Sequence, residues 1–143
     1  MHVPRPREQV FAFFSDASNL ARITPPELGF EILSPEPLEM QSGTYIEYRL
    51  KVWGVPIYWR TLIRLWRPPH EFVDDQLAGP YAEWSHHHVF EESADGGTHI
   101  HDRVRYRLPL EPFGDAAYPL VKRELARIFA FRQSVVARIY AHA

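Results

Sequence analysis

The sequence predicts an α+β domain in which a curved antiparallel sheet of six to seven strands packs around a long C-terminal helix. Three observations support this fold class: an apolar period of two over residues 30–108, short turns rich in Gly and Pro within that region, and an apolar helical period over residues 116–140. The chain has 143 residues, the length of one ordinary domain. We therefore expect residues 1–143 to form a single domain.

Two short helices are expected before the sheet. Residues 7–14 place apolar side chains at helical spacing, and the polar run at 15–19 supplies capping and helix-breaking residues. A second short helix is expected over residues 19–23. The segment Thr24-Pro25-Pro26 ends it, because proline lacks an amide donor and restricts the residue before it.

The sheet is expected to begin with a leading strand at residues 30–33. Five longer segments rich in β-branched and aromatic residues follow, at 44–53, 57–66, 71–77, 82–91 and 98–108. Turn residues separate them at 53–56, 67–70, 78–80 and 94–97. Short connections between consecutive strands favour an antiparallel meander.

The C-terminal segment is expected to be one long helix over residues 116–140, with Pro119 in its first turn. A broad apolar face lies opposite Lys122, Arg123, Arg127 and Arg138. A face of this width needs a large apolar partner, and the inner face of the sheet is the partner that the sequence offers.

The turn at Ala94-Asp95-Gly96 sets the register of the last two strands. A three-residue loop with Gly96 at positive φ pairs Ser93 with Gly97. Counting outward pairs Phe90 with Ile100, His88 with Asp102, His86 with Val104, and Trp84 with Tyr106, all on one face. A buried carboxylate needs a donor, so we predict a contact between His88 and Asp102.

Extending this count through the longer turns places an aromatic wall and a polar stripe on the same inner face. Apolar pockets with a few convergent polar groups are typical of small-molecule sites. The candidate ligand-binding residues are Tyr48, Trp59, Thr61, Phe72, Asp74, Gln76, Trp84, His86, His88, Phe90, Asp102, Tyr106 and, from the helix, Phe129.

The polar stripe admits several interpretations. It could be a self-satisfied hydrogen-bond network in a filled core, or a set of groups that orients a ligand. His86 and His88 with Asp74 or Asp102 also have ligand types suited to zinc or iron, but no third ligand is secure and we expect no metal. As a pair, His88 and Asp102 could carry out general acid-base catalysis, which makes them the candidate catalytic residues.

Composition excludes several classes of function. The chain has no cysteine, which removes disulfides, zinc-thiolate sites and thiol nucleophiles, and a Gly-x-Ser-x-Gly motif is absent. A net charge of -2 disfavours nucleic acid as a partner. No run approaches the ~20 apolar residues of a membrane span. We expect a cytoplasmic protein without a cofactor.

The element order and several motifs resemble the helix-grip fold of the START/Bet v 1-like (SRPBCC) superfamily, which includes polyketide cyclase/dehydrase-like proteins. The motifs are VFAFFSD at residues 10–16, Asn19-Leu20, Thr24-Pro25-Pro26, FVDDQLAGPY at 72–81 and DRVRY at 102–106. The resemblance implies a cavity between sheet and helix that binds a hydrophobic small molecule, whether lipid-like, aromatic or polyketide-like. The alternatives are a cyclase or dehydratase and a protein-interaction module, so whether the protein is an enzyme stays open.

One feature departs from the resemblance. Members of the superfamily begin with a full strand, whereas here only three residues precede Pro4. A short strand at that position leaves an edge that can pair with another chain. A homodimer formed through this sheet edge is therefore one expected assembly.

Overall fold

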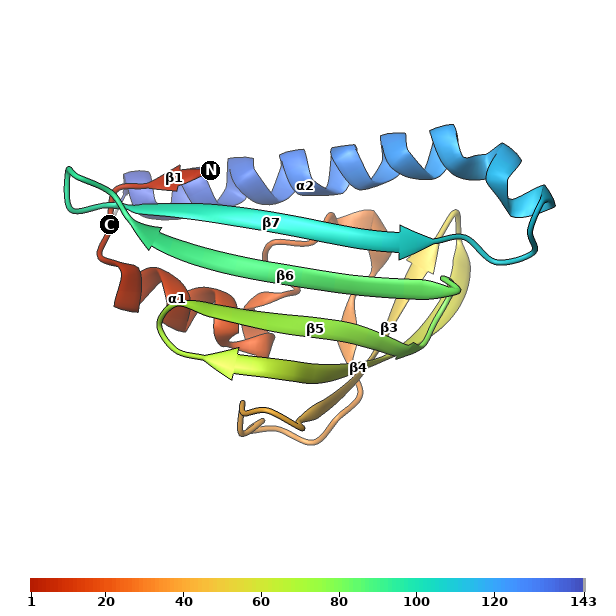
Figure 1. Ribbon diagram of the computed structural model, residues 1–143, viewed down its shortest axis with the longest axis horizontal. Helices are drawn as coiled ribbons and strands as arrows, with labels where there is room; N and C mark the ends of the chain where they lie inside the picture. Colours follow the sequence, from red (N-terminus) through yellow and green to blue (C-terminus); the bar gives the residue numbers. More distant parts are fainter. Residues whose placement is uncertain (143) are drawn as a thin grey trace.

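The computed structural model of the chain describes residues 1–142 and has the predicted helix-grip architecture (Figure 1). Its strands form one antiparallel sheet in the order β1-β7-β6-β5-β4-β3-β2. The strands are β1 His2–Val3, β2 Glu31–Ile32, β3 Tyr45–Val52, β4 Val55–Arg67, β5 Glu71–Ala78, β6 Glu83–Glu92 and β7 Thr98–Arg107. The helices are α1 Arg7–Ser15 and α2 Tyr118–Ala141, with 3-10 turns at Ala17–Asn19, Pro26–Leu28 and Phe113–Ala117.

The long helix α2 runs beside β7 and β1, and α1 crosses the same side of the sheet near its end (Figure 1). The predicted α2 is confirmed, and Pro119 lies in its first turn, where a missing amide donor costs no hydrogen bond. Among residues 1–142, no helix combines the length and the apolar character that crossing a membrane requires.

The predicted register of the last hairpin is confirmed. The Ser93 amide donates to the Gly97 carbonyl (2.9 Å), and Gly96 has φ 82°. All four predicted pairs along β6 and β7 are present, as are Asp74 opposite His86 and Thr61 opposite Gln76 in the neighbouring strand pairs. The polar stripe therefore lies on the inner face of three adjacent strands.

The sequence predictions differ from the structure at the N-terminal part of the chain. A 3-10 turn at Ala17–Asn19 takes the place of the helix predicted over residues 19–23, because Asp16 caps it by accepting a hydrogen bond from the Ser18 amide (2.9 Å). The leading strand predicted at residues 30–33 is shorter in the structure, where it is β2. The first residues do form a strand, β1, in which His2 pairs with His99.

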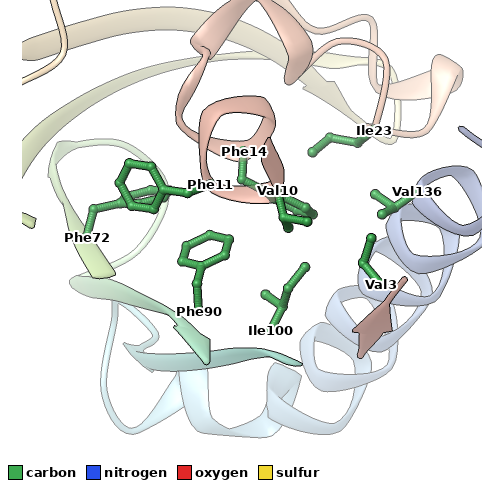
Figure 2. Packing of buried hydrophobic residues seen from close by; sticks show 9 residues of the cluster. All are labelled: Val3, Val10, Phe11, Phe14, Ile23, Phe72, Phe90, Ile100 and Val136. Atoms are coloured by element: carbon green, nitrogen blue, oxygen red, sulfur yellow. The ribbon is translucent and has the colours of Figure 1, made fainter. Parts of the chain in front are cut away.

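A solid hydrophobic core lies under α1. Nine buried residues form it: Val3, Val10, Phe11, Phe14, Ile23, Phe72, Phe90, Ile100 and Val136 (Figure 2). Phe90 is at its centre, with ring centroids 5.2 Å from Phe11 and 5.8 Å from Phe14. Phe90 was predicted to line a cavity wall, and this prediction is wrong because the rings of α1 cover it.

Candidate ligand-binding site

Beyond the solid core, the inner face of the sheet and α2 enclose a cavity of about 590 Å³. This volume lies within the roughly 300–1,000 Å³ of typical small-molecule pockets. Its lining is mainly apolar and comes from β3, β4, the 3-10 turns and α2; members include Leu28, Leu50, Trp59, Val121 and Ile128. Of the predicted ligand-binding residues, those that line it are Tyr48, Trp59, Thr61, Phe72, Asp74, Trp84, His86, His88 and Phe129.

An aromatic wall forms one side of the cavity, with Trp59 at its centre. Tyr48 stacks on Trp59 at a centroid separation of 5.8 Å and an interplanar angle of 14°. Trp84 and Tyr81 meet Trp59 edge-on, at 5.4 Å and 5.7 Å. Tyr81 was not predicted, because it lies in the loop between β5 and β6, where a strand period gives no signal.

Four ionisable side chains form a closed arrangement across β5, β6 and β7. His86 Nε2 lies 2.8 Å from Asp102 Oδ1, and His88 Nε2 lies 2.6 Å from Asp74 Oδ2. The other ring nitrogens face the opposite carboxylates, with His88 Nδ1 at 3.3 Å from Asp102 Oδ1 and His86 Nδ1 at 3.9 Å from Asp74 Oδ2. The centroids of the two imidazoles lie 3.7 Å apart, and their ring planes are inclined by 31°.

The predicted contact between His88 and Asp102 is present, but His86 makes the shorter contact with that carboxylate. Both imidazoles stand on the same face of β6, and diagonal cross-strand neighbours are within reach of long side chains. The register therefore predicted which residues meet, while the side-chain rotamers decide which pair is closest.

Burial and hydrogen bonding set the charges in this arrangement. Burial by itself would raise the pKa of Asp102 and of Asp74, but hydrogen bonds and charge from the two histidines hold the pKa of each below its usual range. Burial would lower the pKa of His88, yet its bonds to both carboxylates outweigh this and raise the pKa. Burial and the neighbouring His88 charge lower the pKa of His86. The site therefore favours the protonated form of His88 over that of His86.

The four groups are not all on the cavity wall. Asp74, His86 and His88 line the cavity, whereas Asp102 and Tyr106 line a more open groove of about 720 Å³ beside β7 and α2. The Asp102 side chain is 22% exposed there. Gln76 lines neither, because its side chain bonds the Tyr81 backbone, with Nε2 donating to the carbonyl (2.8 Å) and Oε1 accepting from the amide (3.1 Å).

Arg132 is a cavity residue that sequence reasoning missed. It lies on α2, lines the cavity, and places its guanidinium 5.2 Å from the centroid of the Phe129 ring. Burial lowers the pKa of Arg132, against the attraction of Asp102 and Asp74. Its spacing of seven residues from Leu125 and four from Ile128 puts it on the apolar face, so an Arg at that spacing is the signal that could have revealed it.

Three residues of the stripe have donor atoms close enough to share a metal ion. One atom each from Asp74, His86 and His88 lies within 4.8 Å of the others, and these ligand types suit zinc or iron. The hydrogen bond between His88 and Asp74 already joins two of these atoms at 2.6 Å. A metal ion bound by these three residues would therefore have to replace the proton between His88 and Asp74.

Residues 3–131 match the family model described as polyketide cyclase / dehydrase and lipid transport. A comparison with curated proteins finds no match.

Solved structures share the fold at low sequence identity. TTHA0849 from Thermus thermophilus is 16% identical with a TM-score of 0.76, over 96% of this chain and 91% of that one. The Zhui aromatase/cyclase from Streptomyces sp. R1128 is 21% identical with a TM-score of 0.70, over 99% and 90%. A START superfamily protein from Mycobacterium smegmatis is 15% identical with a TM-score of 0.65, over 99% and 94%.

The family match covers nearly the whole chain, and the fold agrees with it. The chain belongs to the family described as polyketide cyclase/dehydrase and lipid transport.

Proposed function

We propose that the protein binds a hydrophobic small molecule, lipid-like, aromatic or polyketide-like, in the cavity between the sheet and α2. The observation that carries this proposal is a cavity of about 590 Å³ with an apolar, aromatic lining and one buried polar stripe. Close packing is the normal state of a protein interior, and unfilled apolar volume destabilises a fold. Membership of a family described by cyclase, dehydrase and lipid-transport proteins supports the same proposal.

A ligand that fills the cavity stabilises the folded protein by mass action. At a free ligand concentration one hundred times Kd, the stabilisation is about 2.7 kcal/mol. Naphthalene derivatives are suitable probes, because they are rigid, apolar and small enough for the cavity. We expect 2-acetylnaphthalene to raise the Tm and to quench the fluorescence of Trp59 and Trp84, which line the cavity.

A pair of variants tests whether the probe occupies this cavity. Val121 lines the cavity from α2, whereas Ala130 lies on the exposed side of the same helix. Val121→Trp fills cavity volume and should weaken binding at least tenfold, while Ala130→Trp should leave it unchanged. Equal binding by both variants would place the probe elsewhere, and native mass spectrometry of the purified protein would show any ligand retained from the host.

A second candidate function is dehydration or ring closure of a polyketide-like substrate. It is favoured by the position of the hydrogen-bonded pair His88 and Asp74, both of which line the cavity. In the dehydration of a β-hydroxy ketone, a base removes the proton α to the carbonyl and an acid protonates the departing hydroxyl, which leaves as water. Turnover of such a substrate that is lost in His88→Gln would support this function, and binding without turnover would leave the carrier function alone.

A further inference from the structure

We propose that the ligand carries an uncharged oxygen acceptor, such as a ketone carbonyl, and that Arg132 and Tyr48 donate hydrogen bonds to it. This inference rests on the proposed function, because it names the class of molecule that the same cavity takes. Such a ligand differs from a purely apolar one by a single polar group, which would lie between α2 and β3.

Arg132 is a half-buried cation on the cavity wall, and within the described residues its guanidinium has no hydrogen-bonding partner. Within residues 1–142 the guanidinium makes no hydrogen bond and no ion pair, and its Nε is fully buried without an acceptor. Five N–H groups in a planar fork are normally paired when an Arg is buried. An acceptor on a bound ligand would pair these N–H groups.

Phe129 holds the guanidinium in position. The Arg132 guanidinium lies over the Phe129 ring at 5.2 Å, and Phe129 in turn meets the His86 ring edge-on at 5.5 Å. A guanidinium stacked on a ring keeps its N–H groups free at its edge, since they lie in its own plane. The cation is thus anchored on one side and available to a ligand at its rim.

Tyr48 supplies a second donor on the opposite wall. Its hydroxyl lies 3.5 Å from Thr61 Oγ1, which is a long hydrogen bond, and Tyr48 and Arg132 line the same cavity. Burial raises the pKa of Tyr48, so the hydroxyl keeps its proton. An oxygen atom placed between the two side chains would accept from both.

The charges around Arg132 favour a neutral acceptor over a carboxylate. Asp74 lines the same cavity as Arg132, and Asp74 and Asp102 both attract the guanidinium electrostatically, so two carboxylates already lie near it. A ligand carboxylate would add a third negative group to this region, which is costly in a medium of low polarity. A carbonyl oxygen accepts the same hydrogen bonds without adding charge.

Three probes with one skeleton separate these contributions: 2-ethylnaphthalene, 2-acetylnaphthalene and 2-naphthoate. Titration calorimetry on the wild-type protein should give a Kd for the ketone about tenfold or more below that of the hydrocarbon. The carboxylate should bind more weakly than the ketone. Equal binding of ketone and hydrocarbon, or tighter binding of the carboxylate, would overturn the inference.

Substitutions then assign the preference to its donors. Arg132→Met keeps the apolar stem and removes the donors, so the ketone should lose its advantage while 2-ethylnaphthalene binds as before. Arg138→Met, at an exposed position of the same helix, is the matched control and should change neither Kd. Tyr48→Phe should remove a smaller share, about threefold to tenfold.

The outcomes distinguish this inference from the proposed function. If none of the three probes binds and the purified protein retains no ligand, the proposed function fails. If hydrocarbon and ketone bind equally well, the carrier function stands and the acceptor is wrong. Should Arg132→Met fail to fold, as judged by circular dichroism, Arg132→Lys and the wild-type ligand series still decide the question.

Discussion

The two ends of the sheet have the same kind of inner face but are used in opposite ways. At one end α1 fills the space above β5, β6 and β7 with aromatic rings, and residues such as Phe90 and Ile100 are 1% and 2% exposed. At the other end, where β3 and β4 extend past α1, the aromatic face borders a cavity. Phe72 belongs to both regions. The comparison indicates that the solid end supplies most of the stability of the fold. The residues of the hollow end can therefore serve contacts with a ligand.

The largest effect on stability is expected in the solid end. Phe90→Ala removes a ring that packs against Phe11, Phe14 and Phe72, and should lower the free energy of unfolding by about 3–5 kcal/mol. Urea denaturation measures this difference. A loss below about 1 kcal/mol would mean that the region under α1 is not the stabilising core.

Asp102→Asn should have an intermediate effect, because it removes the carboxylate that both histidines face. We expect a loss on the order of 2 kcal/mol at neutral pH. The folded-state pKa of Asp102 is lowered, so its stabilisation is present above the unfolded pKa of about 3.9 and disappears as the pH falls through the folded value. The variant should therefore lose less stability than wild type between about pH 4 and pH 2.

Thermal or urea unfolding across that pH interval measures the difference. Glu91→Gln is a suitable control, because Glu91 is exposed and, within residues 1–142, its ionic partner is His101 at 3.3 Å. If the stability of wild type and of Asp102→Asn falls equally with pH, the lowered pKa of Asp102 is contradicted. The Glu91→Gln control should follow the wild-type profile.

The smallest effect is expected in the hollow end. Leu50 lines the cavity from β3, so its side chain has protein atoms on one side and open volume on the other. Because it makes fewer contacts than a core residue, Leu50→Ala should cost about 1 kcal/mol or less, against the roughly 2–5 kcal/mol of a core Leu→Ala change. Its effect on probe affinity should exceed that of Phe90→Ala. A larger effect of Phe90→Ala than of Leu50→Ala on probe affinity would contradict the assignment of the cavity to the hollow end.

The sequence predicted the fold and the pairing of the polar stripe well, for physical reasons that are local. Gly96 at positive φ fixes the last hairpin, and a period of two then assigns His86, His88 and Asp102 to one face. The β-bulge between Ile63 and Leu65 did not disturb the placement of Asp74 opposite His86, because that pair depends on the turn between β5 and β6.

The sequence could not separate the filled part of the inner face from the hollow part. Phe90 and Trp84 lie on the same face of β6 with the same period, and only the position of α1 decides which one is covered. Gln76 was predicted as a site residue, but its amide satisfies the backbone of Tyr81, an interaction that no strand period reveals. Arg132 was missed because arginine is usually found on the solvent-exposed side of a helix. Only its spacing from apolar neighbours places it on the apolar face of α2.

The pairing of β1 with β7 has a consequence for how the chain folds. The five strands from β3 to β7 pair with their neighbours in sequence, whereas the pairing of His2 with His99 joins residues separated by almost the whole sheet. Loop-closure entropy disfavours such distant contacts until the intervening chain is compact. The hairpins should therefore form first, and β1 and α1 should close over them afterwards. Substitutions at Val3 would then accelerate unfolding and leave the folding rate almost unchanged.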